Sequence, residues 1–221
     1  GGPAGDWATQ EQIAYLQGKY AGEVAYVDHY VGRFLEKLKR CGYYDDSLII
    51  ILSDHGHPLA DHGKFLKGPD RMYNELLKVP FMMRFPGGEH GGRDIEALAQ
   101  FPDILPTIYD ALGMSINNAI LPGFSLMPVI RGEKEAVREY TISGFNSYGI
   151  IAEAEDRSIR DLKWNYILRP KGQEDELYDQ VDDPQERVNL IREYPAEAKR
   201  LSSCLGLYRT IQKSFLVSGV Q

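Results

Sequence analysis

The sequence predicts an α/β body followed by a small α+β unit, and three observations lead to this fold class. A long amphipathic helix pattern runs directly into a β-branched apolar segment at residues 48–52, as in a crossover connection to a buried strand. After residue 136 the chain changes to short β-rich segments between polar turns, which is typical of an antiparallel sheet. A final helix, predicted over residues 195–215, would cover that sheet. We therefore expect two domains, residues 1–136 and residues 137–221.

The first predicted element is a helix over residues 11–40. Thr9 and Gln12 form a capping-box pattern at its start, and Gly42 supplies a left-handed stop at its end. Its apolar residues recur at steps of three and four and form one stripe, made of Ile13, Leu16, Tyr20, Val24, Val27, Val31, Phe34 and Leu38. We expect this stripe to pack against the sheet, with a coiled coil as the alternative.

Glycine and proline place the remaining elements. A strand is expected over residues 79–85, ended by Pro86-Gly87, and a helix over residues 103–112, which tolerates Pro106 in its first turn and stops at Gly113. A loop with a short helix follows. The antiparallel strands are expected at residues 140–145, 149–153, 162–169 and 176–178.

The charge balance limits the classes of partner. The 221 residues carry 25 basic and 32 acidic side chains, a net charge of −7, which argues against a nucleic-acid or anionic-membrane surface. An anionic substrate would have to be met by local cations. No apolar stretch reaches the roughly 18–20 residues that span a bilayer, and the sequence does not indicate a cellular location.

The most informative motif is Asp54-His55-Gly56, which follows the apolar run at residues 48–52. The two polar side chains therefore emerge at the carboxyl end of a predicted buried strand, which is where α/β sheets bind ligands. A carboxylate beside an imidazole suits a divalent cation. The alternative is an Asx turn at a strand end with an incidental histidine.

Further motifs follow in a fixed order, and together they resemble the sulfatase family of the alkaline phosphatase superfamily. The nearest to the strand are Asp61-His62-Gly63, Lys67-Gly68, Glu75, Val79-Pro80 and Pro86-Gly87. The later ones are Asp103-Ile104-Leu105-Pro106-Thr107, Gly123-Phe124-Ser125-Leu126, Leu177-Tyr178-Asp179, Asp183-Pro184-Gln185-Glu186 and Asn189-Leu190. The resemblance covers about residues 12–194.

The resemblance implies an alkaline-phosphatase-like α/β sandwich and a metal-dependent hydrolase of small-molecule or saccharide sulfate esters that uses a formylglycine nucleophile. By motif position, Asp54 and His55 inherit the role of metal ligands, and Lys67 inherits sulfate binding and charge stabilisation. Calcium is the expected ion, with manganese or magnesium as alternatives. His57 is a candidate substrate contact at the pocket mouth, against the simpler interpretation of a surface-loop histidine.

Neighbouring side chains compete for these roles. Lys64 is the alternative to Lys67, although the spacing favours Lys67. We expect His62 to hydrogen-bond the loop, and Glu75 to anchor Lys78 or nearby backbone.

Two features of such sulfatases do not occur at the start of this chain: the Cys/Ser-x-Pro/Ala-x-Arg nucleophile motif and an Asp-Asp pair of metal ligands. Cys41 and Cys204 lie in other contexts. We therefore expect the C-terminal portion of a sulfatase, inactive alone, whose partner is the N-terminal half or, in its absence, a second copy. The alternatives are a phosphonate monoester or phosphodiester hydrolase of the same superfamily and a non-catalytic, sulfatase-like binding remnant.

Overall fold

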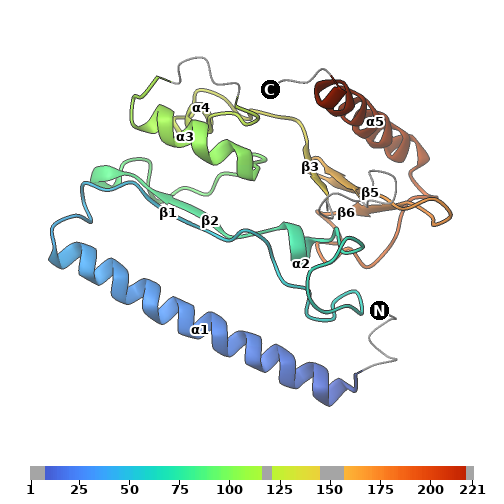
Figure 1. Cartoon of the computed structure of the whole chain (residues 1–221), viewed down its shortest axis with the longest axis horizontal. Helices are drawn as coiled ribbons and strands as arrows, with labels where there is room; N and C mark the ends of the chain where they lie inside the picture. The colour runs from blue at the N-terminus through green and yellow to red at the C-terminus, as the bar shows by residue number, and fades with distance from the viewer. Residues whose placement is uncertain (1–7, 116–120, 145–156, 218–221) are drawn as a thin grey trace. The chain divides into compact units, whose positions relative to one another are not determined.

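The structure is a computed structural model that describes residues 8–115, 121–144 and 157–217 (Figure 1). Its residues form two compact units, one made of Gly1–Lys67 with Glu75–Ile95 and one made of Gly68–Asn74 with Glu96–Gln221. These units are groups of contacting residues and do not test the domain boundary expected at residue 136, which stays a prediction. Mixed helix and sheet in this chain agree with the predicted fold class.

The first unit begins with helix α1 (Gln10–Arg40), whose start and end are as predicted. The Thr9 side chain accepts a hydrogen bond from the Gln12 backbone N–H, and the Gln12 side chain accepts one from the Thr9 N–H. At the other end Gly42 takes a φ of 75°, a left-handed conformation that a glycine adopts without strain.

Strand β1 (Ile49–Leu52) pairs antiparallel with β2 (Phe81–Arg84), which confirms both predicted strands. The expectation that β1 is buried on both faces is wrong for this chain, because all four of its residues are only half-buried. Within the described residues, the two strands form a sheet of their own. A 3-10 turn, η2 (Pro86–Gly88), closes β2 as predicted, and the Gly87 N–H donates to the Asp45 carbonyl.

The apolar stripe of α1 is mostly exposed, whereas the sequence predicted that it packs against the sheet. Ile13 is its one buried residue, whereas Val24, Val27 and Phe34 are more than half exposed. The reason is geometric, since a helix of 31 residues is about 46 Å long and four-residue strands span about 13 Å. Figure 1 shows α1 extending far past both ends of the β1–β2 pair.

The second unit contains a helical segment of 3-10 turn η3 (Phe101–Asp103), helix α3 (Ile104–Ala111) and the short helix α4 (Met127–Ile130), which confirms the helices predicted there. Gly113 takes a φ of 64° just after α3, as its predicted stop. Helix α2 (Asn74–Leu77) begins in this unit with Asn74 and continues in the first unit.

The antiparallel sheet predicted for the C-terminal region is present. Its strands are β3 (Thr141–Gly144), β4 (Arg157–Arg160), β5 (Trp164–Leu168) and β6 (Glu176–Asp179), which pair in that order. The sequence did not predict β4, and the strand expected at residues 149–153 lies outside the described residues.

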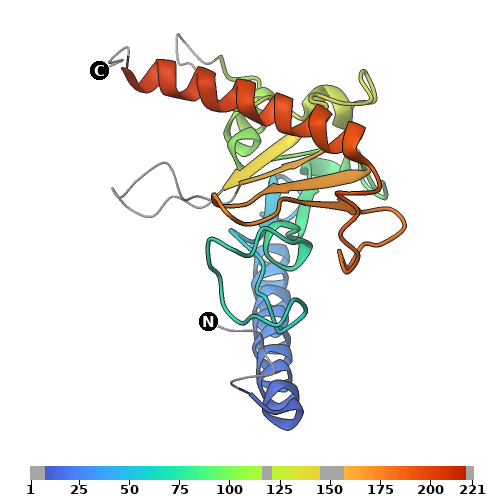
Figure 2. The ribbon, with the colours of Figure 1, turned by 90° about the vertical axis from the view of Figure 1, so that its right-hand side faces the viewer.

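Helix α5 (Pro195–Val217) lies across one face of this sheet, as predicted (Figure 2). The core between them is fully or almost fully buried and consists of Ile159, Trp164, Tyr166, Leu177, Ala198, Leu201 and Leu205. In the described part of the chain, no helix has the length and apolar character that a membrane crossing requires.

Candidate functional site

The turn after β1 is held by its own polar groups. The Ser53 hydroxyl donates to the His55 carbonyl at 2.8 Å, and the Asp54 carboxylate accepts from the His55 backbone N–H at 3.0 Å. The Asp54 side chain remains 76% exposed. The Asp54 bond reaches the N–H of the next residue, whereas an Asx turn would use the N–H two residues on, and it leaves the second carboxylate oxygen available to a ligand.

His55 has a defined tautomer in this turn. Its Nδ1 lies 2.7 Å from the Gly56 carbonyl oxygen, which can only accept, so Nδ1 carries the proton. A neutral ring with its proton on Nδ1 presents the lone pair of Nε2. That nitrogen lies 3.6 Å from Asp54 Oδ2 and 3.2 Å from Lys67 Nζ. The fold thus brings together the three residues selected from the sequence.

Helix α2 contacts the turn that carries Asp54, His55 and Gly56. The Gly56 N–H donates to the Leu76 carbonyl at 2.7 Å. A Cβ atom at position 56 would lie 2.1 Å from the Glu75 carbonyl oxygen, a distance that no side chain can tolerate. Gly56 is therefore required by the close approach of α2 to the turn.

The loop between Gly56 and Lys67 is fastened to α2 by a hydrogen bond between two side chains. His62 Nδ1 lies 2.6 Å from Glu75 Oε1, and both side chains are about 15% exposed or less. The expected structural role of His62 is consistent with this bond, but the proposed anchoring of Lys78 by Glu75 is not what the structure shows. Leu66, just before Lys67, takes a φ of 66°, an uncommon conformation for a non-glycine residue.

His57 lies against the long helix. Its ring stacks on Tyr20 of α1, with centroids 5.2 Å apart and planes inclined by 17°. Nearby, the Gln17 side chain donates to the Leu59 carbonyl at 2.9 Å. These contacts join α1 to the loop that carries Lys67, and they give His57 a packing role. Its role as a substrate contact stays a prediction.

The donor set at Asp54 and His55 fits part of a divalent-metal site. A carboxylate oxygen and an imidazole nitrogen are suitable ligands, and a His whose other ring nitrogen donates to a backbone carbonyl is held as metal-binding histidines are. Their 3.6 Å separation is short enough for one ion, because two metal–ligand bonds of about 2.4 Å can span it. Among the residues described here, no cluster of three or more His, Cys, Asp or Glu side chains completes such a site.

Other family-like motifs serve the structure. The buried Asp103 carboxylate accepts from the backbone N–H groups of Gln100 at 2.7 Å and Phe124 at 2.9 Å, and it pairs with Arg138. The Thr107 hydroxyl accepts from the Leu126 N–H at 2.9 Å. These bonds tie the segment after residue 121 to the start of α3.

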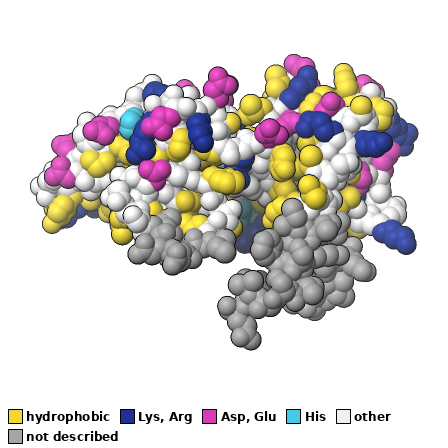
Figure 3. Space-filling view, turned by 90° about the horizontal axis from the view of Figure 1, so that it is seen from above, with side chains coloured by type: hydrophobic (Ala, Val, Ile, Leu, Met, Phe, Trp, Pro, Cys, Tyr) yellow, Lys and Arg dark blue, Asp and Glu magenta, His cyan; other side chains and the backbone are white. Residues whose placement is uncertain are grey.

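Charge on the surface is mixed in sign. Figure 3 shows acidic and basic side chains interspersed over the face that it presents. An anionic group would therefore depend on specific cations such as Lys67 rather than on a broad basic field.

Two family profiles match the chain. One is described as Sulfatase and covers residues 5–114, and the other is described as N-sulphoglucosamine sulphohydrolase, C-terminal, and covers residues 60–205. An arylsulfatase of Clostridium perfringens is 28% identical over 85% of this chain and 42% of its own length.

Solved structures show the same likeness. A protein solved in complex with its substrate D-glucosamine-2-N,6-O-disulfate matches with a TM-score of 0.79 and 27% identity, over 95% of this chain and 44% of that one. The phosphonate monoester hydrolase of Agrobacterium radiobacter matches with a TM-score of 0.79 and 30% identity, over 93% and 43%. The chain thus spans less than half the length of these relatives.

Proposed function

The chain belongs to the sulfatase family and corresponds to a C-terminal portion of its longer members, and on that premise we propose that it supplies part of the active site of a metal-dependent sulfate ester hydrolase. The observation that carries the proposal is the convergence of Asp54, His55 and Lys67 at the end of β1. A motif match alone would not require these side chains to meet.

Asp54 and His55 would hold the cation through one carboxylate oxygen and Nε2. When bound there, a divalent cation supplies Lewis-acid stabilisation of charge on the ester oxygens. We keep calcium as the ion that the family resemblance implies, with manganese or magnesium as alternatives; the Asp54 carboxylate suits all three ions, and the imidazole nitrogen suits manganese better than calcium. Two ligands make a weak site, so further ligands come from outside the described residues.

Lys67 would bind an oxygen of the sulfate group and stabilise the negative charge that develops during cleavage. Its ammonium lies beside His55 Nε2, so the cation and the lysine would approach the same anion from neighbouring positions. The likeness to a protein solved with a glucosamine disulfate supports a sulfated saccharide as the substrate class.

The nucleophile of this reaction would lie outside this chain, in the length of the relatives that the chain does not span. That part would also cover the exposed apolar stripe of α1 and pair with the free side of the β1–β2 sheet, because an isolated two-stranded sheet is marginally stable. We therefore expect this chain alone to be inactive, and to self-associate through α1 when the rest is absent.

A phosphonate monoester hydrolase is the second candidate function, since one such enzyme matches the chain as well as the sulfatases do. Rates on an aryl sulfate and an aryl phosphonate ester, measured with the protein purified from its native cells, separate the two. The proposal expects the sulfate to be hydrolysed faster, and expects Lys67→Ala to abolish that rate while Lys64→Ala retains it.

The intact mass of the same native protein is the complementary test. We expect a mass well above the 25.0 kDa of this chain, with a Cys or Ser converted to formylglycine. A native product of 25.0 kDa with no such modification and no rate on either ester would favour a non-catalytic binding protein.

A further inference from the structure

Glu186 is a buried carboxylate in an uncommon backbone conformation. Its side chain is 0% exposed, and its φ is 53°, in the left-handed region that non-glycine residues rarely adopt. A buried charge is costly unless it is paired and hydrogen-bonded. The partners of Glu186 therefore indicate what the residue does.

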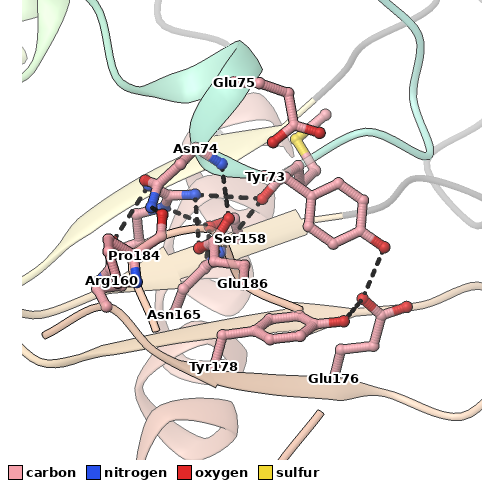
Figure 4. A network of polar contacts seen from close by, with 12 residues as sticks. Tyr73, Asn74, Glu75, Ser158, Arg160, Asn165, Glu176, Tyr178, Pro184 and Glu186 are labelled. Atoms are coloured by element: carbon pink, nitrogen blue, oxygen red, sulfur yellow. Dashed lines mark hydrogen bonds and ion pairs between the residues drawn. The ribbon is translucent and has the colours of Figure 1, made fainter. Parts of the chain in front are cut away.

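The two carboxylate oxygens have separate partners, as Figure 4 shows. Oε1 accepts from Asn165 Nδ2 at 2.7 Å and lies 3.4 Å from the Arg160 guanidinium, both on the C-terminal sheet. Oε2 accepts from the backbone N–H of Asn74 at 2.6 Å. Arg160 also donates to the Asn74 side chain at 2.5 Å, and Asn74 donates to the Pro184 carbonyl at 2.9 Å.

Asn74 is the first residue of α2, whose next residues support the candidate site. Glu75 binds His62, and the Leu76 carbonyl accepts from Gly56, directly after His55. The chain is continuous through α2, so a restraint on Asn74 is transmitted along one helical turn to both bonds.

We propose that Glu186 is a positioning residue, whose carboxylate holds the first residue of α2 and so stabilises the two bonds that the following residues of α2 make to the Gly56 N–H and to His62. The inference rests on the proposed function for its significance to catalysis. It assigns to the Asp183-Pro184-Gln185-Glu186 motif a role in the geometry of a site that lies far from it in the sequence.

Glutamine at position 186 tests the inference sharply. Both oxygens of Glu186 accept hydrogen bonds, whereas glutamine offers one acceptor and one NH2 donor. Either orientation of the amide therefore places a donor against Asn74 N–H or against Asn165 Nδ2. Glu186→Gln conserves the shape of the side chain, and it weakens the hold on the Asn74 N–H in either orientation, because that N–H then faces either a donor or a neutral oxygen that accepts less strongly than a carboxylate.

The experiment uses the isotope-labelled chain without metal or substrate. Amide hydrogen exchange of Gly56 and the imidazole nitrogen chemical shifts of His62 report on the site, and the amides of β5 and β6 report on the sheet. We expect Glu186→Gln to accelerate Gly56 exchange by about tenfold or more and to shift the His62 signals. Glu174→Gln, which removes an exposed carboxylate paired with Arg192, is the matched control and should change neither.

A second variant guards against a loss of folding in Glu186→Gln. Asn74→Ala removes the side-chain bonds of α2 to Arg160 and Pro184 but leaves Glu186 intact, and we expect Gly56 exchange to rise by about threefold. The inference is overturned if Gly56 and His62 are unchanged in both variants, or if the sheet amides accelerate as much as Gly56. Because no metal, substrate or rate enters these readouts, their outcome is independent of whether the chain serves a sulfatase.

Discussion

Replacing Lys67 with methionine should strengthen the binding of a divalent cation to this chain. The Lys67 ammonium lies 3.2 Å from His55 Nε2, the nitrogen that we assign to the metal. An ion on that nitrogen meets a like charge nearby, so removing the ammonium removes a repulsion. Methionine keeps a similar length and flexibility without the charge.

The magnitude follows from the geometry and the exposure. A charge of +2 and a charge of +1 at a separation of about 5 Å repel by about 1.7 kcal/mol in a solvent-like dielectric of about 80. That dielectric is appropriate because the side chains of Asp54 and His55 are 76% and 33% exposed. Since 1.4 kcal/mol corresponds to about tenfold in affinity, we expect Mn²⁺ to bind roughly tenfold more tightly at low salt.

Titration of the chain with Mn²⁺, followed by the electron paramagnetic resonance signal of the free ion, measures this change. Lys64→Met is the control, because it removes the same charge from the lysine that the spacing disfavours. Two results would refute the assignment of His55 Nε2 as a metal ligand beside the Lys67 ammonium. One is an Mn²⁺ affinity that is unchanged or weaker in Lys67→Met, and the other is an equal gain of affinity in Lys64→Met. The opposite effect is expected for anions, since Lys67→Met removes the ammonium that we propose to bind a sulfate oxygen and should weaken the binding of inorganic sulfate.

Three further predictions concern the surroundings of the site. Burial raises the pKa of the Glu176 carboxyl, but hydrogen bonding and charge from Arg169 outweigh burial and lower this pKa overall. The ionised carboxylate therefore stabilises the folded chain fully at neutral pH, and this contribution to the unfolding free energy is lost as the pH falls below about 4. Glu176→Gln should flatten that acid dependence of the unfolding free energy in urea. Asp103→Asn should cost about 3 kcal/mol in the same assay and Asp45→Asn less than about 1 kcal/mol, because their side chains are 0% and 84% exposed; equal costs would contradict the role of burial. Gly56→Ala should destabilise the chain by about 2 kcal/mol or more through its clash with Glu75, whereas Gly18→Ala, with open space in α1, should stabilise it by up to about 1 kcal/mol.

The family motifs divide into two groups once the structure is known. One group has side-chain atoms that are available to a ligand, and it consists of Asp54, His55 and Lys67. The other group is fully buried and accepts its hydrogen bonds from the protein itself, and it consists of Asp103 and Glu186. A motif in the sequence does not distinguish these groups, because both need charged residues at fixed spacing. Burial separates them.

Some elements were predictable because their signals are local. The ends of α1 follow from a capping box within three residues and from one glycine, and the sheet after residue 136 follows from short alternating segments. Strand β4 was missed because Arg157-Ser158-Ile159-Arg160 is polar along most of its length. Its Ser158 and Arg160 are nevertheless buried, since partners from distant segments satisfy them.

The sequence by itself determined most of the helices and strands and which residues are candidates for the site, because periodicity, capping and motif order act over short distances. Only the tertiary structure decided how these residues act on one another. The approach of Lys67 to His55 over 12 positions, the pairing of His62 with Glu75 over 13 positions and the bond from Glu186 to Asn74 over 112 positions depend on contacts that close loops of chain. Such contacts form only when packing brings the segments together, so no local pattern predicts them.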